Sequence, residues 1–385
     1  MLFYIYSKAN SQIMASLKRR TWLKSLSVAG AGAITLHPKD ILELIPDDTK
    51  TAKKNSIIRL SSNENPYSPS TTMQEVIQNF GSELCRYPNQ FFSDLEYQIA
   101  EKEGIDPAHI VITSGSREGL KAVGMMKSMK GNQIITCLPT YRALIDYADF
   151  IGADIKALPL DKDMLFDLSG IEEAIDDQTS MVFVCNPNNP TGTLLEPEYL
   201  TDWCIRTSKK TTVFVDEIYY DYIETQGYPS MKSLVLDGHD VIIARTLSKV
   251  YGLAGIRIGY MIASKETAEE IRTSLHSGPN ILAIRLAQAA LKDEEFYEFS
   301  LKKNQQAKQI IYRTLDAVGL RYIKSHTNFV FFHTGLPIEE VHEKYVEQGI
   351  LVGRPFPPFM DWCRVSTGSI EEVEKFARAS RLIFS

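Results

Sequence analysis

The sequence predicts an α/β protein in which a mostly parallel sheet forms a large domain and a smaller α+β domain follows at the C-terminus. Short apolar runs rich in β-branched residues alternate with helical patterns, which is typical of a parallel sheet covered on both faces. From about residue 279, long helical patterns take over, followed by strand-like runs. The chain has 385 residues, 44% of them hydrophobic, which is enough for two cores.

Residues 1–36 are predicted to be an export signal. KRRTWLK at residues 18–24 precedes a weakly apolar run, and AGA at residues 31–33 is a candidate processing site. A paired arginine before a short apolar run resembles a twin-arginine signal, and a membrane-spanning helix would need ~20 apolar residues. We therefore expect periplasmic export without stable membrane insertion. A basic arm lying on a partner subunit of a cytoplasmic protein is the alternative.

The composition argues against several classes of function. A net charge of -6 disfavours nucleic acid as a partner. The five cysteines are widely spaced without a CxxC pair, so they indicate neither a disulfide framework nor a zinc site. The seven histidines are also scattered, and we therefore expect no metal centre.

The order of the runs suggests the domain limits. Residues 37–75 are expected to form an arm that contributes to the small domain, residues 76–278 the large domain, and residues 279–385 the small domain. The strand-like runs of the large domain are HIVIT (109–113), QIITCL (133–138), MVFVC (181–185), TVFVD (212–216) and DVIIA (240–244). Ligands of open parallel sheets bind beyond the carboxyl ends of the strands, so polar residues at those ends are candidates for a site.

Small and hydroxyl residues follow the run at 109–113. Ser116 and Arg117 stand in VITSGSREGL, between a strand-like run and a helical pattern. Glycine and serine at the start of a helix expose backbone N–H groups that bind phosphate. The same residues make ordinary helix caps, so this segment indicates either an anion site or a cap.

The next strand ends carry amide, carboxylate and phenol groups. Asn189 lies in CNPNNPTGT, where Asn-Pro steps predict a rigid turn, while Asp216 ends the run at 212–216 and Tyr219 follows it. A carboxylate at the end of a buried strand must be paired, capped or used, for example to hold a protonated ring nitrogen. Ordinary turn residues and a surface aspartate are the alternatives.

Lys249 follows the run at 240–244, in RTLSKVYGLAGIR. An amine held among apolar residues and near a cation has a lowered pKa, which makes it a nucleophile at neutral pH. Thr246, Ser248 and Arg257 supply two hydroxyls and a guanidinium, which suit a phosphate dianion. The alternative is a lysine whose stem crosses an apolar face with its ammonium in water.

Together, these strand ends supply the contacts that pyridoxal 5′-phosphate requires. The sequence resembles the class I/II aminotransferases of pyridoxal-phosphate fold type I, and among them the histidinol-phosphate aminotransferases. The resemblance runs from SSNENPYSPS, which begins at residue 61, to CRVSTGSIEEVEKF near the C-terminus. The order and spacing of these motifs are highly specific to that family.

The resemblance implies a role for each candidate residue. Lys249 forms a Schiff base with the cofactor, Asp216 pairs with its ring nitrogen, and Asn189 and Tyr219 hydrogen-bond its ring oxygen. Tyr141, in PTYRAL, stacks on the ring. The expected phosphate ligands are Ser116, Arg117, Thr246, Ser248 and Arg257. Tyr87, in CRYPNQ, reaches the cofactor of a neighbouring subunit, so the resemblance implies a homodimer with shared active sites.

Two arginines are expected to select the substrate. By the resemblance, Arg364 in WCRVSTG binds the substrate carboxylate, and Arg354 in LVGRPF helps to hold a substrate phosphate. Asn65 and Tyr67 of NENPY, with Asn328 of TNF, lie at the substrate entrance of that family. An ordinary ion pair is the alternative for Arg354. Two departures are Arg117, where relatives often have a small or acidic residue, and FPPF, which replaces a glycine-rich loop.

The implied reaction is a transamination between histidinol phosphate, or another amino acid or amino phosphate, and a 2-oxo acid such as 2-oxoglutarate. Histidinol phosphate belongs to a cytoplasmic biosynthetic pathway, which does not agree with an export signal. The alternatives on the same scaffold are a decarboxylase similar to threonine-phosphate decarboxylase and an aromatic amino acid aminotransferase. A DNA-binding regulator would need an added domain, for which the N-terminal segment is too short. The complete set of cofactor contacts argues against an inert binding protein.

Overall fold

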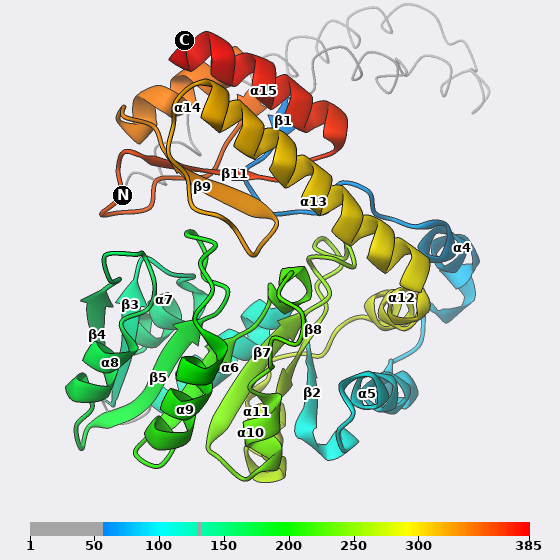
Figure 1. Ribbon diagram of the computed structural model, residues 1–385. Helices are drawn as coiled ribbons and strands as arrows, with labels where there is room; N and C mark the ends of the chain where they lie inside the picture. Colours follow the sequence, from blue (N-terminus) through cyan, green and yellow to red (C-terminus); the bar gives the residue numbers. More distant parts are fainter. Residues whose placement is uncertain (1–56, 129–131) are drawn as a thin grey trace, which may run out of the picture. The chain divides into compact units, whose positions relative to one another are not determined.

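The computed structural model describes residues 57–128 and 132–385 (Figure 1). The predicted export signal at residues 1–36 and the first part of the predicted arm, residues 37–56, lie outside the described residues. No helix in the described ranges is long and apolar enough to cross a membrane.

A mostly parallel sheet is the centre of the large part of the molecule, as the sequence predicted. Its seven described strands have the order β2-β8-β7-β6-β5-β3-β4, and β8 alone runs opposite to the other six. The strands are β2 (Ile110–Thr113), β3 (Gln133–Leu138), β4 (Asp154–Pro159), β5 (Thr179–Cys185), β6 (Thr212–Asp216), β7 (Val241–Thr246) and β8 (Gly259–Ile262).

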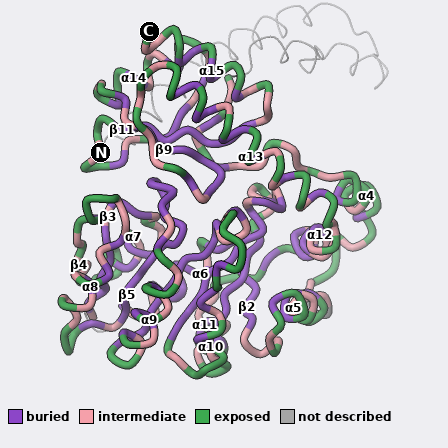
Figure 2. Tube along the Cα trace, viewed as in Figure 1, coloured by how far each residue is buried: buried purple, intermediate pink, exposed green. Residues whose placement is uncertain are grey.

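Helices cover both faces of this sheet. Every residue of β2, β6 and β7 is buried, which is why these strands read as unbroken apolar runs (Figure 2). The surrounding helices are α4 (Thr71–Asn79), α5 (Asn89–Glu103), α6 (Ser116–Ser128), α7 (Ala143–Phe150), α8 (Leu168–Ala174), α9 (Pro197–Thr207), α10 (Lys232–Leu236), α11 (Lys265–Ser274) and α12 (Ile281–Lys292). Short 3₁₀ turns are η1 (Phe80–Glu83), η2 (Pro107–His109) and η3 (Tyr220–Tyr222).

A second, smaller core lies between strands and helices of the C-terminal part (Figure 1). Strand β9 (Phe329–His333) pairs antiparallel with β11 (Trp362–Ser366), while β1 (Ile58–Arg59) pairs in parallel with β10 (Ile350–Leu351). Helices α13 (Glu294–Ala317), α14 (Ile338–Glu347) and α15 (Ile370–Phe384) pack on these strands. The N-terminal segment thus reaches the small part, where Leu60 joins its core.

The two cores are connected through α12 and α13. Helix α12 packs on the core of the large sheet, and α13 contributes Phe296 to that core but Ala307 and Ile311 to the smaller one. A single helix shared by both cores means that no one residue separates them. The domain limits near residues 76 and 279 therefore stay predictions.

Local signals in the sequence account for the ends of several helices. At the start of α15, the Ser369 Oγ accepts a hydrogen bond from the Glu372 N–H at 3.3 Å, and the Glu372 carboxylate accepts one from the Ser369 N–H at 2.8 Å. Such a reciprocal capping box satisfies two N–H groups that a helix start otherwise leaves unpaired. It fixes where α15 leaves β11, the strand that carries Arg364.

Candidate active site

Functional groups gather where parallel strands of the large sheet end. Asp216 is the last residue of β6 and Thr246 the last of β7, and Lys249 follows in the next turn. Strands β6 and β7 are neighbours in which Asp216 pairs with Ala244. Parallel pairing therefore brings a carboxylate and an amine to the same edge of the sheet.

Lys249 is partly buried and has no carboxylate in direct contact among the described residues. Its Nζ donates a hydrogen bond to the Asn63 carbonyl at 3.0 Å and lies 5.4 Å from the centroid of the Tyr219 ring. Burial lowers the pKa of the amine to about 7, with repulsion from Arg364 and Arg257 adding to the effect and Glu64 and Asp216 opposing it. A large fraction of this amine is therefore neutral near pH 7 and able to act as a nucleophile or base.

Asp216 is a fully buried carboxylate that is only partly satisfied. Its Oδ1 accepts a long hydrogen bond of 3.4 Å from the Ile218 N–H, and its Oδ2 has no partner among the described residues. Burial raises the pKa of Asp216 to about 7, although the Ile218 N–H and Lys249 favour the ionised form. A buried oxygen without a donor is costly, and this one is suited to receive an N–H from a bound molecule.

A hydrogen-bond chain connects Tyr219 to the small part of the molecule. The Tyr219 hydroxyl accepts from the Asn63 Nδ2 at 2.9 Å and from the Asn189 Nδ2 at 3.4 Å. The Asn189 Oδ1 in turn accepts from the Arg364 Nη1 at 2.6 Å. Asn63 was not among the residues predicted from the sequence, although it is the first residue of the NENPY motif. It adopts a positive φ of 55°, which asparagine tolerates well.

Arg364 is a buried cation on β11. Its Nη2 donates to the Ser61 carbonyl at 2.7 Å, its Nε has no partner among the described residues, and its guanidinium lies 4.9 Å from the centroid of the Phe356 ring. Burial lowers the pKa of Arg364 to about 10, so the group stays charged at neutral pH. An unpaired buried cation is costly, and an anionic ligand would relieve that cost.

A second group of residues forms an anion cradle at the start of α6. Gly115 has a φ of 75°, and a Cβ there would collide with the Arg257 guanidinium. A Cβ at Gly259 would lie 2.7 Å from the Ser116 backbone nitrogen. Only glycine at these two positions lets the Arg257 side chain and the Ser116 N–H, at the first turn of α6, come so close to the backbone. Free N–H groups next to a cation favour the binding of a phosphate.

Two hydroxyl residues, one at the end of β7 and one just after it, adjoin this cradle. The Arg257 Nη1 lies 3.5 Å from the Ser248 Oγ and donates to the Ala254 carbonyl at 2.8 Å. The Ser248 N–H donates to the Thr246 Oγ1 at 3.1 Å. The structure thus brings Ser248, Thr246 and Arg257 together, as their spacing led us to expect.

Arg117 and Tyr141 form a pair at the rim. The Arg117 Nε donates to the Tyr141 hydroxyl at 3.3 Å, and the Arg117 side chain is exposed. The guanidinium that departs from the family pattern thus lies next to the tyrosine expected to stack on the ring.

Other candidate residues line a small cavity or lie on the surface. Asn65, Tyr67 and Asn328 line a cavity of about 10 Å³, and the Asn65 Nδ2 donates to the Val250 carbonyl at 2.8 Å. Neither polar atom of the buried Asn328 side chain has a partner among the described residues. Tyr87 is 90% exposed on the surface. Their substrate and subunit contacts stay predictions.

Comparison with known proteins identifies relatives of the whole described chain. The family model "Aminotransferase class I and II" matches residues 55–379. Histidinol-phosphate aminotransferase of Anoxybacillus flavithermus is 34% identical over 329 residues, covering 84% of this chain and 88% of that protein. The protein of the same name from Brevibacillus brevis is 33% identical over 326 residues, with coverages of 83% and 88%.

A solved structure has the same fold. Histidinol-phosphate aminotransferase from Sinorhizobium meliloti, crystallised in complex with pyridoxal 5′-phosphate, matches with a TM-score of 0.78 and 24% identity over 92% of this chain and 99% of that one. Fold and site together define a pyridoxal-phosphate enzyme of fold type I. More particularly, the chain belongs to the class I and II aminotransferases, and it is therefore a pyridoxal-phosphate-dependent transaminase.

The residues at the sheet edge fit this cofactor. The unpartnered Asp216 Oδ2 is suited to the N–H of a protonated ring nitrogen, and the cradle of Ser116 and Arg257 is suited to a phosphate dianion. When bound, pyridoxal phosphate supplies a ring that accepts electrons as the substrate Cα–H bond breaks.

Proposed function

We propose that this transaminase acts on histidinol phosphate and passes its amino group to a 2-oxo acid such as 2-oxoglutarate. The proposal rests on a pair of arginines that both lie close to one phenylalanine ring. Arg364 and Arg354 lie 4.9 Å and 4.4 Å from the centroid of the Phe356 ring. Arg364 is buried, whereas Arg354 is exposed and its Nη1 donates only to the adjacent Pro355 carbonyl among the described residues. Two cations without carboxylate partners suit a phosphate-bearing substrate that alternates with a dicarboxylic acid.

The proposed roles at the sheet edge follow from charge and position. Lys249, with a lowered amine pKa, holds the cofactor and then moves the proton that leaves the substrate Cα. Asp216 keeps a proton on the ring nitrogen, because a carboxylate so deeply buried gains from a charged partner. Asn189 and Tyr219 hold the ring oxygen, and Tyr141 covers the ring face.

The cradle is proposed to hold the cofactor phosphate. Ser116 offers its N–H at the start of α6, and Arg257 offers its guanidinium. Thr246, at the end of β7, and Ser248, in the turn after it, add hydroxyl donors. Arg117 adds a further cation at the rim, next to Tyr141. The residues at the small cavity, Asn65, Tyr67 and Asn328, are proposed to shape the substrate entrance.

Replacing Arg354 with methionine should raise the KM for histidinol phosphate by roughly 10–100-fold, the effect of losing one charge-assisted contact to phosphate. The KM for glutamate should rise less, because its second carboxylate carries one negative charge where a phosphate dianion carries two, and Arg364 is retained for the other carboxylate. Steady-state kinetics with each donor measure this difference. The matched control is Arg321→Met, which removes another exposed arginine that lies over an aromatic ring, that of Trp362. Equal effects of Arg354→Met on both donors would contradict a phosphate contact.

We also propose a homodimer in which Tyr87 contacts the cofactor phosphate of the partner subunit. Its 90% exposed ring and the nearby Leu84, 70% exposed, support a covered surface in a dimer. Tyr87→Phe should weaken cofactor binding roughly tenfold, since one hydroxyl contact to an anion is lost. An absorbance titration of cofactor into the apoprotein measures this, with Tyr97→Phe as the control at another exposed tyrosine. A monomer in sedimentation would contradict the dimer.

Finally, we propose that residues 1–36 direct twin-arginine export to the periplasm. The support is the KRRTWLK segment followed by a short apolar run. Cell fractionation should find the mature enzyme in the periplasm. Residence of the full-length chain only in the cytoplasm would contradict export and would favour the basic-arm alternative.

A further inference from the structure

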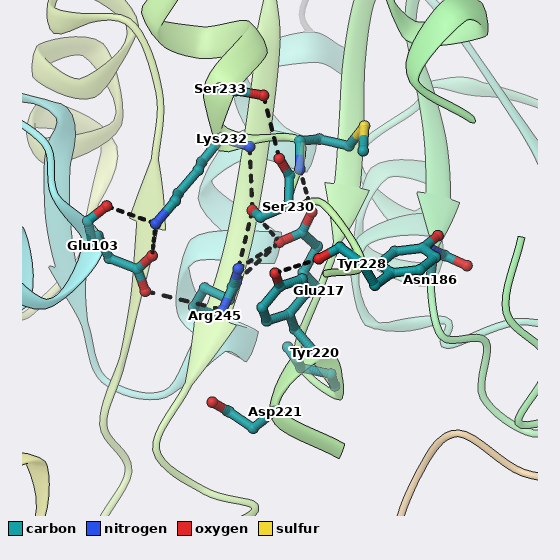
Figure 3. Close-up of polar contacts among 12 residues, drawn as sticks. Glu103, Asn186, Glu217, Tyr220, Asp221, Tyr228, Ser230, Lys232, Ser233 and Arg245 are labelled. Atoms are coloured by element: carbon teal, nitrogen blue, oxygen red, sulfur yellow. Dashed lines mark hydrogen bonds and ion pairs between the residues drawn. The ribbon is translucent and has the colours of Figure 1, made fainter. Parts of the chain in front are cut away.

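A buried cluster of charged side chains lies beside the sheet edge and has no part in the proposed reaction. It contains two carboxylates and two cations: Glu103, Glu217, Lys232 and Arg245 (Figure 3). Burying such charges is costly unless they are paired in good geometry. The cost suggests that the cluster serves something beyond general stability.

The centre of the cluster is a pair between Arg245 and Glu217. The Arg245 Nη2 and Nε lie 2.8 Å and 3.0 Å from the Glu217 Oε2. The same oxygen accepts from the Ser230 Oγ at 2.8 Å, and Oε1 accepts from the Met231 N–H at 2.8 Å. Arg245 and Glu217 are only 5% and 3% exposed. Glu217 is thus held by three different groups and has little freedom to turn.

The remaining contacts of Arg245 fix its guanidinium from the other sides. Its Nη2 donates to the Ser230 Oγ at 3.0 Å, and its guanidinium lies 4.0 Å from the centroid of the Tyr220 ring. The Glu103 Oε1 is 3.9 Å away and accepts from the Tyr260 hydroxyl at 2.5 Å. The other Glu103 oxygen accepts from Lys232 at 2.8 Å. Apart from Glu217, Arg245 is therefore positioned by three elements: η3, α5 and the turn before α10.

The pair joins β6, which ends at Asp216, to β7, which leads into the turn that carries Lys249. Glu217 directly follows Asp216 at the end of β6, and Arg245 lies in β7, shortly before Lys249. The Glu217 N–H also donates to the Ala244 carbonyl of β7 at 3.1 Å. Successive side chains in an extended strand point to opposite faces, so fixing Glu217 on one face fixes the direction of Asp216 on the other.

We propose that Arg245 and Glu217 form a positioning pair, which clamps the ends of β6 and β7 and neutralises a carboxylate beside Asp216. The inference rests on the proposed roles of Asp216 and Lys249. The pair touches neither reacting atoms nor cofactor. It acts by holding the Asp216 carboxylate and the Lys249 amine in their places and by keeping extra charge away from them.

Electrostatics give this pair a signature that packing alone would not produce. The Glu217 carboxylate raises the pKa of Asp216, and Arg245 offsets that negative charge. Removing the Arg245 cation should therefore raise the pKa values of the groups at the sheet edge, whereas removing the Glu217 charge should lower them. The charged groups that act directly on Lys249 are Arg364, Arg257, Glu64 and Asp216, and the test leaves all of them in place. Lys232 and Asp221 complete the charges around Arg245.

The test uses the holoenzyme and the variants Arg245→Met, Glu217→Gln and the double variant. The first readout is the midpoint of the pH-dependent change in visible absorbance of the bound cofactor. It should move up in Arg245→Met, down in Glu217→Gln, and return close to the wild-type value in the double variant. The kcat of Arg245→Met should fall at least about tenfold, a barrier change of about 1.4 kcal/mol, with KM changed less than about threefold. The rate of Lys249 acylation in the cofactor-free protein is measured against pH as a second readout. Its midpoint should also lie above the wild-type value in Arg245→Met and below it in Glu217→Gln.

Lys232→Met is the matched control. It removes another cation of the same cluster, but Lys232 contacts Glu103 and not Glu217. It should lower the unfolding temperature without moving the absorbance midpoint. If Arg245→Met does not fold, Arg245→Lys replaces it in the test. Lysine keeps the positive charge but cannot place two nitrogens against the Glu217 carboxylate, so the absorbance midpoint should stay at the wild-type pH while kcat falls. The proposed role of the pair would be wrong if the variants changed only the unfolding temperature. It would also be wrong if the absorbance midpoints of Arg245→Met and Glu217→Gln moved in the same direction. A wild-type enzyme without a visible band would instead overturn the proposed role of Lys249.

Discussion

Lys249→Ala should abolish transamination and remove the visible absorbance of the lysine-bound cofactor. The loss of kcat should be at least about 10⁴-fold, because one amine both holds the cofactor and moves the substrate proton. Its lowered pKa of about 7 gives Lys249 the neutral form that both tasks need, and alanine offers neither. An absorbance spectrum of the purified variant and a steady-state assay measure the two effects.

The control for this change is Lys265→Ala, which removes an exposed lysine that pairs with Asp106 at 2.6 Å. An exposed ion pair contributes little to stability, so spectrum and activity should stay near wild type. A Lys249→Ala enzyme that keeps the visible band and turns over would refute the role proposed for Lys249.

Asp216→Asn should bind the cofactor yet lose about 10²–10³-fold in kcat, the usual effect of removing one preorganised electrostatic contact. The phosphate cradle of Ser116 and Arg257 is untouched, which is why binding should persist. An uncharged amide cannot hold a proton on the ring nitrogen, so the ring accepts electrons less well. Cofactor titration and rapid single-turnover kinetics measure the two effects separately.

Asp221→Asn is the control for this change. It also replaces a carboxylate whose pKa is raised by burial. The Asp221 Oδ1 accepts a hydrogen bond from the Tyr297 hydroxyl at 3.1 Å, away from the sheet edge. This variant should lose stability but keep its turnover within a few-fold of wild type. Near-normal turnover of Asp216→Asn would contradict the assignment of the ring-nitrogen partner.

The mostly parallel sheet and the placement of its strand-end residues could be predicted because both depend on local patterns. Apolar runs of β-branched residues predict buried parallel strands, and the carboxyl ends of such strands share one edge. Asp216 and Lys249 therefore had to lie near each other once β6 and β7 were recognised as neighbours. The grouping of Thr246, Ser248 and Arg257 also followed, since a short turn connects them.

Contacts between distant segments could not be predicted from the sequence. Asn63 reaches the Tyr219 hydroxyl from the N-terminal segment, and its backbone carbonyl receives the Lys249 amine. Glu217 and Arg245 likewise read as ordinary charged residues until strand pairing places them side by side. Such pairings depend on how separate elements pack, which periodicity and motifs do not encode.

The FPPF segment illustrates an intermediate case. Its departure from a glycine-rich loop predicted a changed pocket wall without saying how. In the structure, both guanidinium groups lie close to the Phe356 ring, at 4.4 Å and 4.9 Å from its centroid. The Phe356 ring also meets the buried Phe331 edge-on at 6.0 Å between centroids. A rigid aromatic residue thus takes the place of flexible backbone beside Arg354 and Arg364. Its effect on substrate choice depends on which amine the site accepts.

The measurement that tests the central claim most directly is a single-turnover reaction without a 2-oxo acid. The purified enzyme is mixed separately with histidinol phosphate, threonine phosphate, glutamate and an aromatic amino acid. We expect histidinol phosphate and glutamate each to convert the bound cofactor to its amino form in stoichiometric amounts, with loss of the visible band. Carbon dioxide release from threonine phosphate, or conversion only by the aromatic amino acid, would contradict the proposed substrate, and no conversion by any donor would contradict transamination itself.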